Sequence, residues 1–168
     1  MDESYWDVSE LEQYGFQFDT DVSANLHALQ QNSAYGRVYS PSFGGGTCDV
    51  EFEALTGYSV SYLPNGSKPY QQHVTKPMFA LPSYLKTQGY QTAAVHCFWA
   101  RYWSRDTAYP NLGLDDFISL EKMHGVEKVR RHYWTTGLVT DDSMADQIIG
   151  QYETMKEKSD APVFLHAV

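Results

Sequence analysis

Hydrophobic residues along this chain follow two patterns that predict different elements. In some stretches they recur every three to four residues, as in a helix with one buried face, and in others they form the short continuous runs of buried strands. We expect helices over residues 21–32, 47–55, 82–89 and from Asp141 or Asp142 onward, and strands over 35–39, 92–96, 117–120 and 163–168. This alternation predicts an α/β domain with a mainly parallel sheet flanked by helices.

The same pattern predicts which side chains face the core. Val50 and Leu55 are expected to turn inward, and the last helix carries an apolar stripe made of Met144, Ile148, Ile149, Tyr152 and Met155. Between the predicted elements, residues 58–77 read as a long loop and residues 99–113 as an irregular aromatic stretch. Long loops inside compact domains are often functional, as residues 58–77 could be.

Composition narrows the classes of function. The net charge of -9 argues against a nucleic-acid surface, because phosphate backbones are bound by basic stripes. It leaves a phosphate-ester substrate open, since a bound divalent metal can reverse the local field. The spacing of the two cysteines, Cys48 and Cys97, fits no zinc or redox motif. No apolar run reaches the ~18 residues typical of a membrane span.

The strongest local feature is a loop of three glycines, Gly44 to Gly46, followed by Thr47 at the start of an expected helix. Glycine lets a backbone approach a ligand closely, and the start of a helix carries partial positive charge. A hydroxyl at this point can attack phosphorus if a metal or a base activates it. The same residues also fit an ordinary glycine loop with a threonine cap, and such loops are common.

Four segments, taken in order, resemble one family of enzymes: Glu3 to Asp7, Gly44 to Glu53, Leu55 to Gly57, and His96 to Asp106. Together they are similar to the lipoteichoic acid synthase and phosphoglycerol transferase family, a sulfatase-like branch of the alkaline phosphatase superfamily. The resemblance runs across nearly the whole chain and implies the fold of that superfamily.

The resemblance implies a metal centre and a nucleophile. Glu3 matches the acidic metal ligand of the family, and Thr47 matches the nucleophile, which also ligates the metal. Both are oxygen ligands, and such ligands suit Mn²⁺ or Mg²⁺. The family completes this centre with an Asp-His pair from the later half of the domain. That pair is not found in residues 1–168, which we therefore expect to form the N-terminal part of the catalytic domain and to be inactive alone.

The resemblance also implies a substrate pocket made of His96, Trp103 and Arg105. A guanidinium can hold phosphate oxygens in a bidentate fork, an indole offers a flat face to glycerol carbons, and an imidazole can donate to a substrate oxygen. Ser104 stands where the family commonly has asparagine.

The implied reaction is transfer of glycerol phosphate from phosphatidylglycerol to a polyol or glycan acceptor of the cell envelope, through a covalent threonine intermediate. The family places this domain on the outer face of the bacterial membrane, anchored by a segment outside this chain. Three alternatives stay open. They are a phosphate- or sulfate-ester hydrolase on the same scaffold, a cysteine enzyme using Cys48 with His96, and a non-catalytic module that binds glycerol-phosphate polymers through Trp103 and Arg105.

Overall fold

A computed structural model describes residues 5–131 and 134–168. The chain divides into two compact units, one within residues 2–40 and the other within residues 41–168. Each unit is described by itself.

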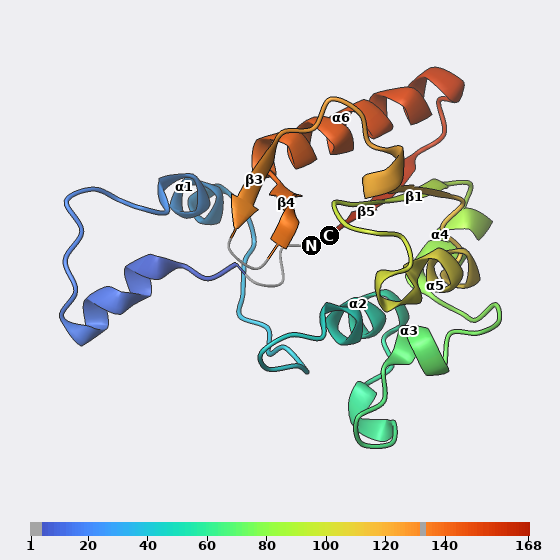
Figure 1. Ribbon diagram of the computed structural model, residues 1–168, viewed down its shortest axis with the longest axis horizontal. Coiled ribbons are helices and arrows are strands. Elements are labelled where there is room, and N and C mark those ends of the chain that lie inside the picture. Colours follow the sequence, from blue (N-terminus) through green and yellow to red (C-terminus); the bar gives the residue numbers. More distant parts are fainter. Residues whose placement is uncertain (1–4, 132–133) are drawn as a thin grey trace. The chain divides into compact units, whose positions relative to one another are not determined.

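The larger unit is built on a three-stranded parallel sheet (Figure 1). The central strand β1 (Gln91–His96) pairs with β2 (Asp116–Ser119) on one side and with β5 (Val163–Ala167) on the other. In register, Ala94 lies opposite both Phe117 and His166. The predicted α/β class and parallel sheet are confirmed, and all three strands begin and end within two residues of the predicted bounds.

Helices lie on both sides of this sheet. In Figure 1, α6 (Asp141–Lys158) runs above the strands, and a group of shorter helices lies below them. That group consists of α2 (Thr47–Thr56), α3 (Pro69–Gln72), α4 (Leu81–Thr87) and α5 (Arg105–Leu112). Three 3₁₀ turns, η2 (Val60–Tyr62), η3 (Tyr102–Ser104) and η4 (Leu120–Lys122), and a hairpin of β3 (Lys128–Arg131) and β4 (Trp134–Val139) complete the unit.

The core fills the space between this helix group and the sheet. Its buried members come from α2, α3, α5, β1 and the connecting loops: Cys48, Phe52, Leu55, Tyr70, Val74, Ala80, Ala94, Ala108, Tyr109, Leu112 and Leu114. Leu55 is buried as predicted, but Val50 is only half-buried, while Glu51 is fully buried. The buried face of α2 therefore includes a charged residue, which a purely hydrophobic pattern cannot identify.

Four sequence predictions are wrong. Residues 35–39 form no strand, and Val38 and Tyr39 are 94% and 98% exposed. The stretch 99–113 contains η3 and α5, and the loop 58–77 contains η2 and α3. Of the apolar stripe on α6, Met155 is buried, whereas Ile149 and Tyr152 are about half exposed. An apolar pattern marks a surface that is able to pack, and it does not identify what packs against it.

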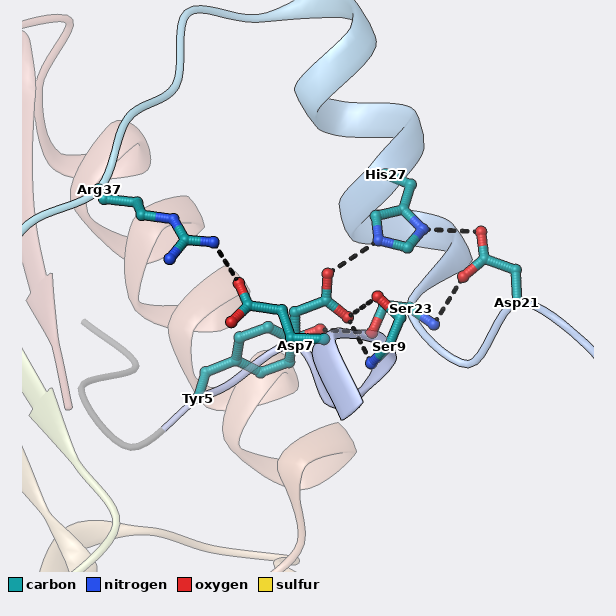
Figure 2. A network of polar contacts seen from close by, with 8 residues as sticks. Tyr5, Asp7, Ser9, Asp21, Ser23, His27 and Arg37 are labelled. Atoms are coloured by element: carbon teal, nitrogen blue, oxygen red, sulfur yellow. Dashed lines mark hydrogen bonds and ion pairs between the residues drawn. The ribbon is translucent and has the colours of Figure 1, made fainter. Parts of the chain in front are cut away.

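The smaller unit holds the 3₁₀ turn η1 (Val8–Tyr14) and helix α1 (Ala24–Asn32), which begins three residues later than predicted. Figure 2 shows the imidazole of His27 between two carboxylates. Its Nε2 lies 2.9 Å from Oδ2 of Asp7, and its Nδ1 lies 2.8 Å from Oδ2 of Asp21. The same Asp7 accepts hydrogen bonds from the backbone and the hydroxyl of Ser9, so one ring ties η1 to α1.

Candidate active site at the start of helix α2

The glycine loop places Thr47 at the first position of α2. All three glycines have positive φ values, 72°, 122° and 86°, and Gly46 is the residue that caps the helix. A left-handed backbone is costly for residues with a Cβ, so this turn requires glycine. Thr47 is half-buried at the start of a helix, where the helix dipole places partial positive charge that favours anions. The helix start predicted at Thr47 is confirmed, and this end of α2 suits a phosphate group.

Three polar side chains converge on Gly46. A Cβ at this position would lie 2.7 Å from Oγ of Ser42, 2.8 Å from Nζ of Lys68 and 2.9 Å from Oδ2 of Asp49. Asp49 accepts a hydrogen bond from the Ser42 hydroxyl at 3.0 Å, and the Lys68 ammonium donates to it at 2.7 Å. This polar cluster of Ser42, Asp49 and Lys68 leaves no room for a larger residue in the turn before Thr47.

Trp103 lies beside the polar cluster. The Lys68 ammonium is 5.3 Å from the centre of the Trp103 ring, within the range of a cation–π contact. Trp103 and Ser104 both have left-handed backbone, with φ values of 58° and 59°. Such strain in residues other than glycine is often found at functional sites. Trp103, a predicted substrate residue, thus lies near the polar cluster at the start of α2, although it is 56 positions from Thr47 in sequence.

Arg105 is held by a buried carboxylate. Its Nε donates to Oε2 of Glu51 at 3.3 Å, and its Nη2 makes a short contact with Oε1. Its Nη1 donates to the carbonyl of Tyr102 at 3.1 Å. Both charged side chains are almost completely buried, at 1% exposure for Arg105 and 0% for Glu51. The guanidinium fork that was predicted to hold phosphate therefore holds Glu51, and its contact with substrate stays a prediction.

Glu51 has further partners. The hydroxyl of Tyr109 donates to its Oε2 at 2.7 Å, and Nε2 of His166 lies 3.6 Å from the same oxygen. Burial alone would raise the pKa of Glu51, but the nearby ring of His166, the charge of Arg105 and the Tyr109 hydrogen bond outweigh it and lower the pKa to about 2. The carboxylate stays ionised, so α2, α5 and β5 are joined by a buried charged network.

Sequence reasoning missed these partners for identifiable reasons. Glu51 was part of the glycine-loop segment that carries the resemblance, but it was given no role. A signal was available, because Glu51 follows Thr47 by four residues and so occupies a neighbouring position one helical turn away. Lys68 and Tyr109 had no such signal. They lie in stretches that were expected to be irregular.

His96 ends β1, as predicted, and is 6% exposed. Its Nδ1 lies 3.0 Å from the carbonyl oxygen of Val168, so Nδ1 carries the proton in that contact. Its Nε2 is buried without a hydrogen-bond partner among the described residues. Burial, followed by the charge of Arg105, lowers the pKa of His96 to about 4. At neutral pH, His96 is therefore an uncharged ring whose Nε2 is a buried acceptor, and its contact with substrate stays a prediction.

The two predicted metal ligands are Glu3 and Thr47, and their role as ligands stays a prediction. Glu3 lies outside the described residues. Among the described ones, no group of three or more His, Cys, Asp or Glu side chains could hold a metal ion. Thr47 would supply one oxygen, and Asp49 is engaged by Lys68 and Ser42. A hard divalent cation takes about six oxygen ligands, so the described residues alone do not fit a metal centre.

The cysteine alternative is disfavoured by burial. Cys48 is 0% exposed, and its Sγ lies 3.5 Å from Oδ1 of Asp49. Burial, with the charge of Asp49 next, raises the pKa of Cys48 to about 12. The reactive thiolate is therefore not populated near neutral pH.

Comparisons with known proteins agree with this fold. A model of the Sulfatase family matches residues 3–168. The chain is 36% identical over 169 residues to a protein of Rhizobium meliloti (strain 1021) named for cyclic beta-1,2-glucan modification, a match that covers 100% of this chain and 24% of the relative. The chain thus spans about a quarter of the length of that relative.

Two solved structures share the fold. The phosphoglycerol transferase GacH of Streptococcus pyogenes, in complex with sn-glycerol-1-phosphate, is 24% identical with a TM-score of 0.70, covering 89% of this chain and 37% of GacH. The lipoteichoic acid synthase LtaP of Listeria monocytogenes is 16% identical with a TM-score of 0.62, covering 77% of this chain and 29% of LtaP.

The chain belongs to the Sulfatase family, in the alkaline phosphatase superfamily. The resemblance predicted from the sequence is confirmed. Members of this superfamily generally depend on divalent metals. Over the described residues, no helix has both the length and the apolar character needed to cross a membrane.

Proposed function

We propose that the protein carrying this chain transfers glycerol phosphate from phosphatidylglycerol to a cell-envelope acceptor, with Thr47 as the nucleophile. The observation that carries the proposal is the position of Thr47. It begins α2 directly after three left-handed glycines and the polar cluster around Gly46, and Lys68 of that cluster lies over the Trp103 ring. A helix start of this kind supports an anionic phosphate, and the indole supports the glycerol carbons.

The reaction takes place in two displacements. First, the Thr47 oxygen forms a bond to phosphorus while the bond from phosphorus to the diacylglycerol oxygen breaks. The proton lost by the threonine is balanced by the proton that the diacylglycerol oxygen gains. Second, an acceptor hydroxyl attacks the same phosphorus, and Thr47 leaves and recovers a proton. His96 is suited to hold a hydroxyl of the glycerol or of the acceptor, because its neutral Nε2 is an acceptor.

A glycan is the acceptor favoured by the comparisons. The relative at 36% identity is named for modification of a cyclic beta-1,2-glucan. A polyol remains the alternative acceptor, and water would make the protein a hydrolase of the same family. Dependence on Mn²⁺ or Mg²⁺, ligation by Glu3 and Thr47, and a place on the outer membrane surface belong to the same proposal. A binding module that performs no turnover is the remaining alternative.

The test uses the complete protein that carries this chain. It is incubated with phosphatidylglycerol vesicles with and without a cyclic glucan, and diacylglycerol and glycerophosphorylated glucan are measured. The proposal predicts both products, and loss of both in Thr47→Ala. Release of free glycerol phosphate with no dependence on glucan favours the hydrolase. Binding of glycerol phosphate without any diacylglycerol favours the binding module.

A further inference from the structure

Lys68 occupies a position that the proposed reaction does not yet use. Its ammonium lies between two groups of the site, 2.7 Å from Oδ2 of Asp49 and 5.3 Å from the centre of the Trp103 ring. The side chain of Lys68 is 30% exposed, so it lies at the surface of the unit and is not sealed in the core as Arg105 is. An ammonium has three N–H donors, and among the described residues Asp49 is its one recorded hydrogen-bond partner.

The site has a shortage of available positive charge. Two other cations lie within two residues of Trp103 in sequence: Arg105 is buried and paired with Glu51, and Arg101 is exposed and lies 3.9 Å from Asp106. Asp49 places a negative charge in the first turn of α2, where a substrate phosphate would be repelled by it. Lys68 offsets that charge and keeps donors to spare. Of these three cations, Lys68 is the one placed against the Gly46 turn at the start of α2, where the substrate phosphate is proposed to bind.

We propose that Lys68 is a substrate-binding residue that contacts the phosphate of an anionic glycerol-phosphate ester held between Thr47 and Trp103. This inference rests on the proposed function, because it names a residue that binds the substrate phosphate at the same site. Sequence reasoning gave no role to Lys68, which lies in the stretch expected to be a loop. The competing role is a clamp, in which Lys68 only fixes Asp49 and the Gly46 turn.

Two substitutions separate the roles by the sign of their effects. In Lys68→Met the phosphate loses a charged contact, so the inhibition constant of glycerol phosphate and the KM for phosphatidylglycerol should rise by about 10-fold or more. In Asp49→Asn the ammonium keeps its neighbour and loses a competing charge, so glycerol phosphate should bind equally well or more tightly. A clamp predicts that both substitutions weaken binding and lower kcat together.

The experiment measures kcat, KM and the inhibition constant of glycerol phosphate in the complete protein. Lys68→Arg should recover most of the affinity, since it restores the charge. Lys86→Met is the matched control, because Lys86 forms a more exposed lysine–aspartate pair with Asp115 and plays no part in the proposed site. Melting temperatures identify variants that lose stability. If Lys68→Met alone unfolds, the double variant Lys68→Met/Asp49→Asn replaces it, because it removes the unpaired charge of Asp49 together with the charge of Lys68.

Three results decide the outcome. Weaker binding in Lys68→Met with preserved binding in Asp49→Asn supports the inference. Unchanged binding of glycerol phosphate in Lys68→Met, or equal losses of binding in both variants, overturns the inference about Lys68. Diacylglycerol release by the wild-type protein would in that case still support the proposed function. A wild-type protein that neither binds glycerol phosphate nor releases diacylglycerol overturns the proposed function itself.

Discussion

Glu51 follows Thr47 by four residues on α2 and holds the guanidinium of Arg105 in a fully buried ion pair. The helix that presents the predicted nucleophile is thereby fixed to α5, at whose first position Arg105 lies. Tyr109 adds a hydrogen bond to the same carboxylate from the next turn of α5. The position of Thr47 thus depends on a polar contact in the core as well as on apolar packing.

Removal of the charge of Glu51 should destabilise the larger unit strongly. In Glu51→Gln the buried guanidinium of Arg105 loses its counter-ion, which typically costs about 3–5 kcal/mol of unfolding free energy. Chemical denaturation measures this loss. Glu157→Gln, at an exposed position of α6, should change stability by less than about 0.5 kcal/mol.

The effect of Glu51→Gln should also depend on pH in a defined direction. The folded pKa of Glu51 is lowered to about 2, so the carboxylate stabilises the fold fully above its unfolded pKa of about 4.3. That contribution is lost as the pH falls through the folded pKa. The difference between wild type and variant should therefore be constant near neutral pH and should shrink between about pH 4 and pH 2. A difference that grows on acidification would contradict the assigned network.

His27 should make the smaller unit more stable at acidic than at alkaline pH. Hydrogen bonds that His27 donates to Asp21 and then to Asp7 raise the pKa of His27 (Figure 2). Because the pKa of His27 is raised on folding, protonated His27 stabilises the folded unit fully below its unfolded pKa of about 6.5. This stabilisation is lost as the pH rises through the pKa of His27 in the folded state. Hydrogen exchange of residues 8–14 and 24–32 should therefore accelerate at high pH beyond the intrinsic rate. His27→Gln should abolish this extra dependence, and His73→Gln, at an exposed loop position, should retain it.

Ser104→Asn should stabilise the protein. Ser104 has left-handed backbone with φ 59°, a conformation that asparagine tolerates better than serine. The expected gain is up to about 1 kcal/mol, seen as a higher melting temperature. Ser33→Asn is the control, because Ser33 has extended backbone with φ -140° and should gain nothing. No gain at Ser104 would indicate that the left-handed turn is not maintained in solution. The asparagine common in the family at this position is explained by the same backbone.

Removal of divalent metal should abolish transfer in the complete protein. Chelation is expected to stop diacylglycerol release, and Mn²⁺ or Mg²⁺ should restore it. Glu3→Gln should raise the metal concentration needed for half-maximal activity, since it removes one proposed hard oxygen ligand. Full activity after chelation would exclude the metal from the proposal.

The sequence predicted the sheet and the glycine turn because local patterns determine them. The apolar run of β1 and the three glycines before Thr47 each carry their own signal. The partners of Arg105 and Trp103 could not be predicted, because Glu51 and Lys68 meet them only through tertiary packing. The strand expected over residues 35–39 failed for a related reason. An apolar run forms a strand only where another strand accepts its hydrogen bonds.

The position of the covalent intermediate tests the account most directly. The complete protein is mixed with phosphatidylglycerol in the absence of acceptor, quenched in acid and digested, and the peptide containing Gly46, Thr47 and Cys48 is examined by mass spectrometry. The account predicts a glycerophosphate ester on Thr47 and none in Thr47→Ala. An adduct on Cys48, or full turnover by Thr47→Ala, would contradict it.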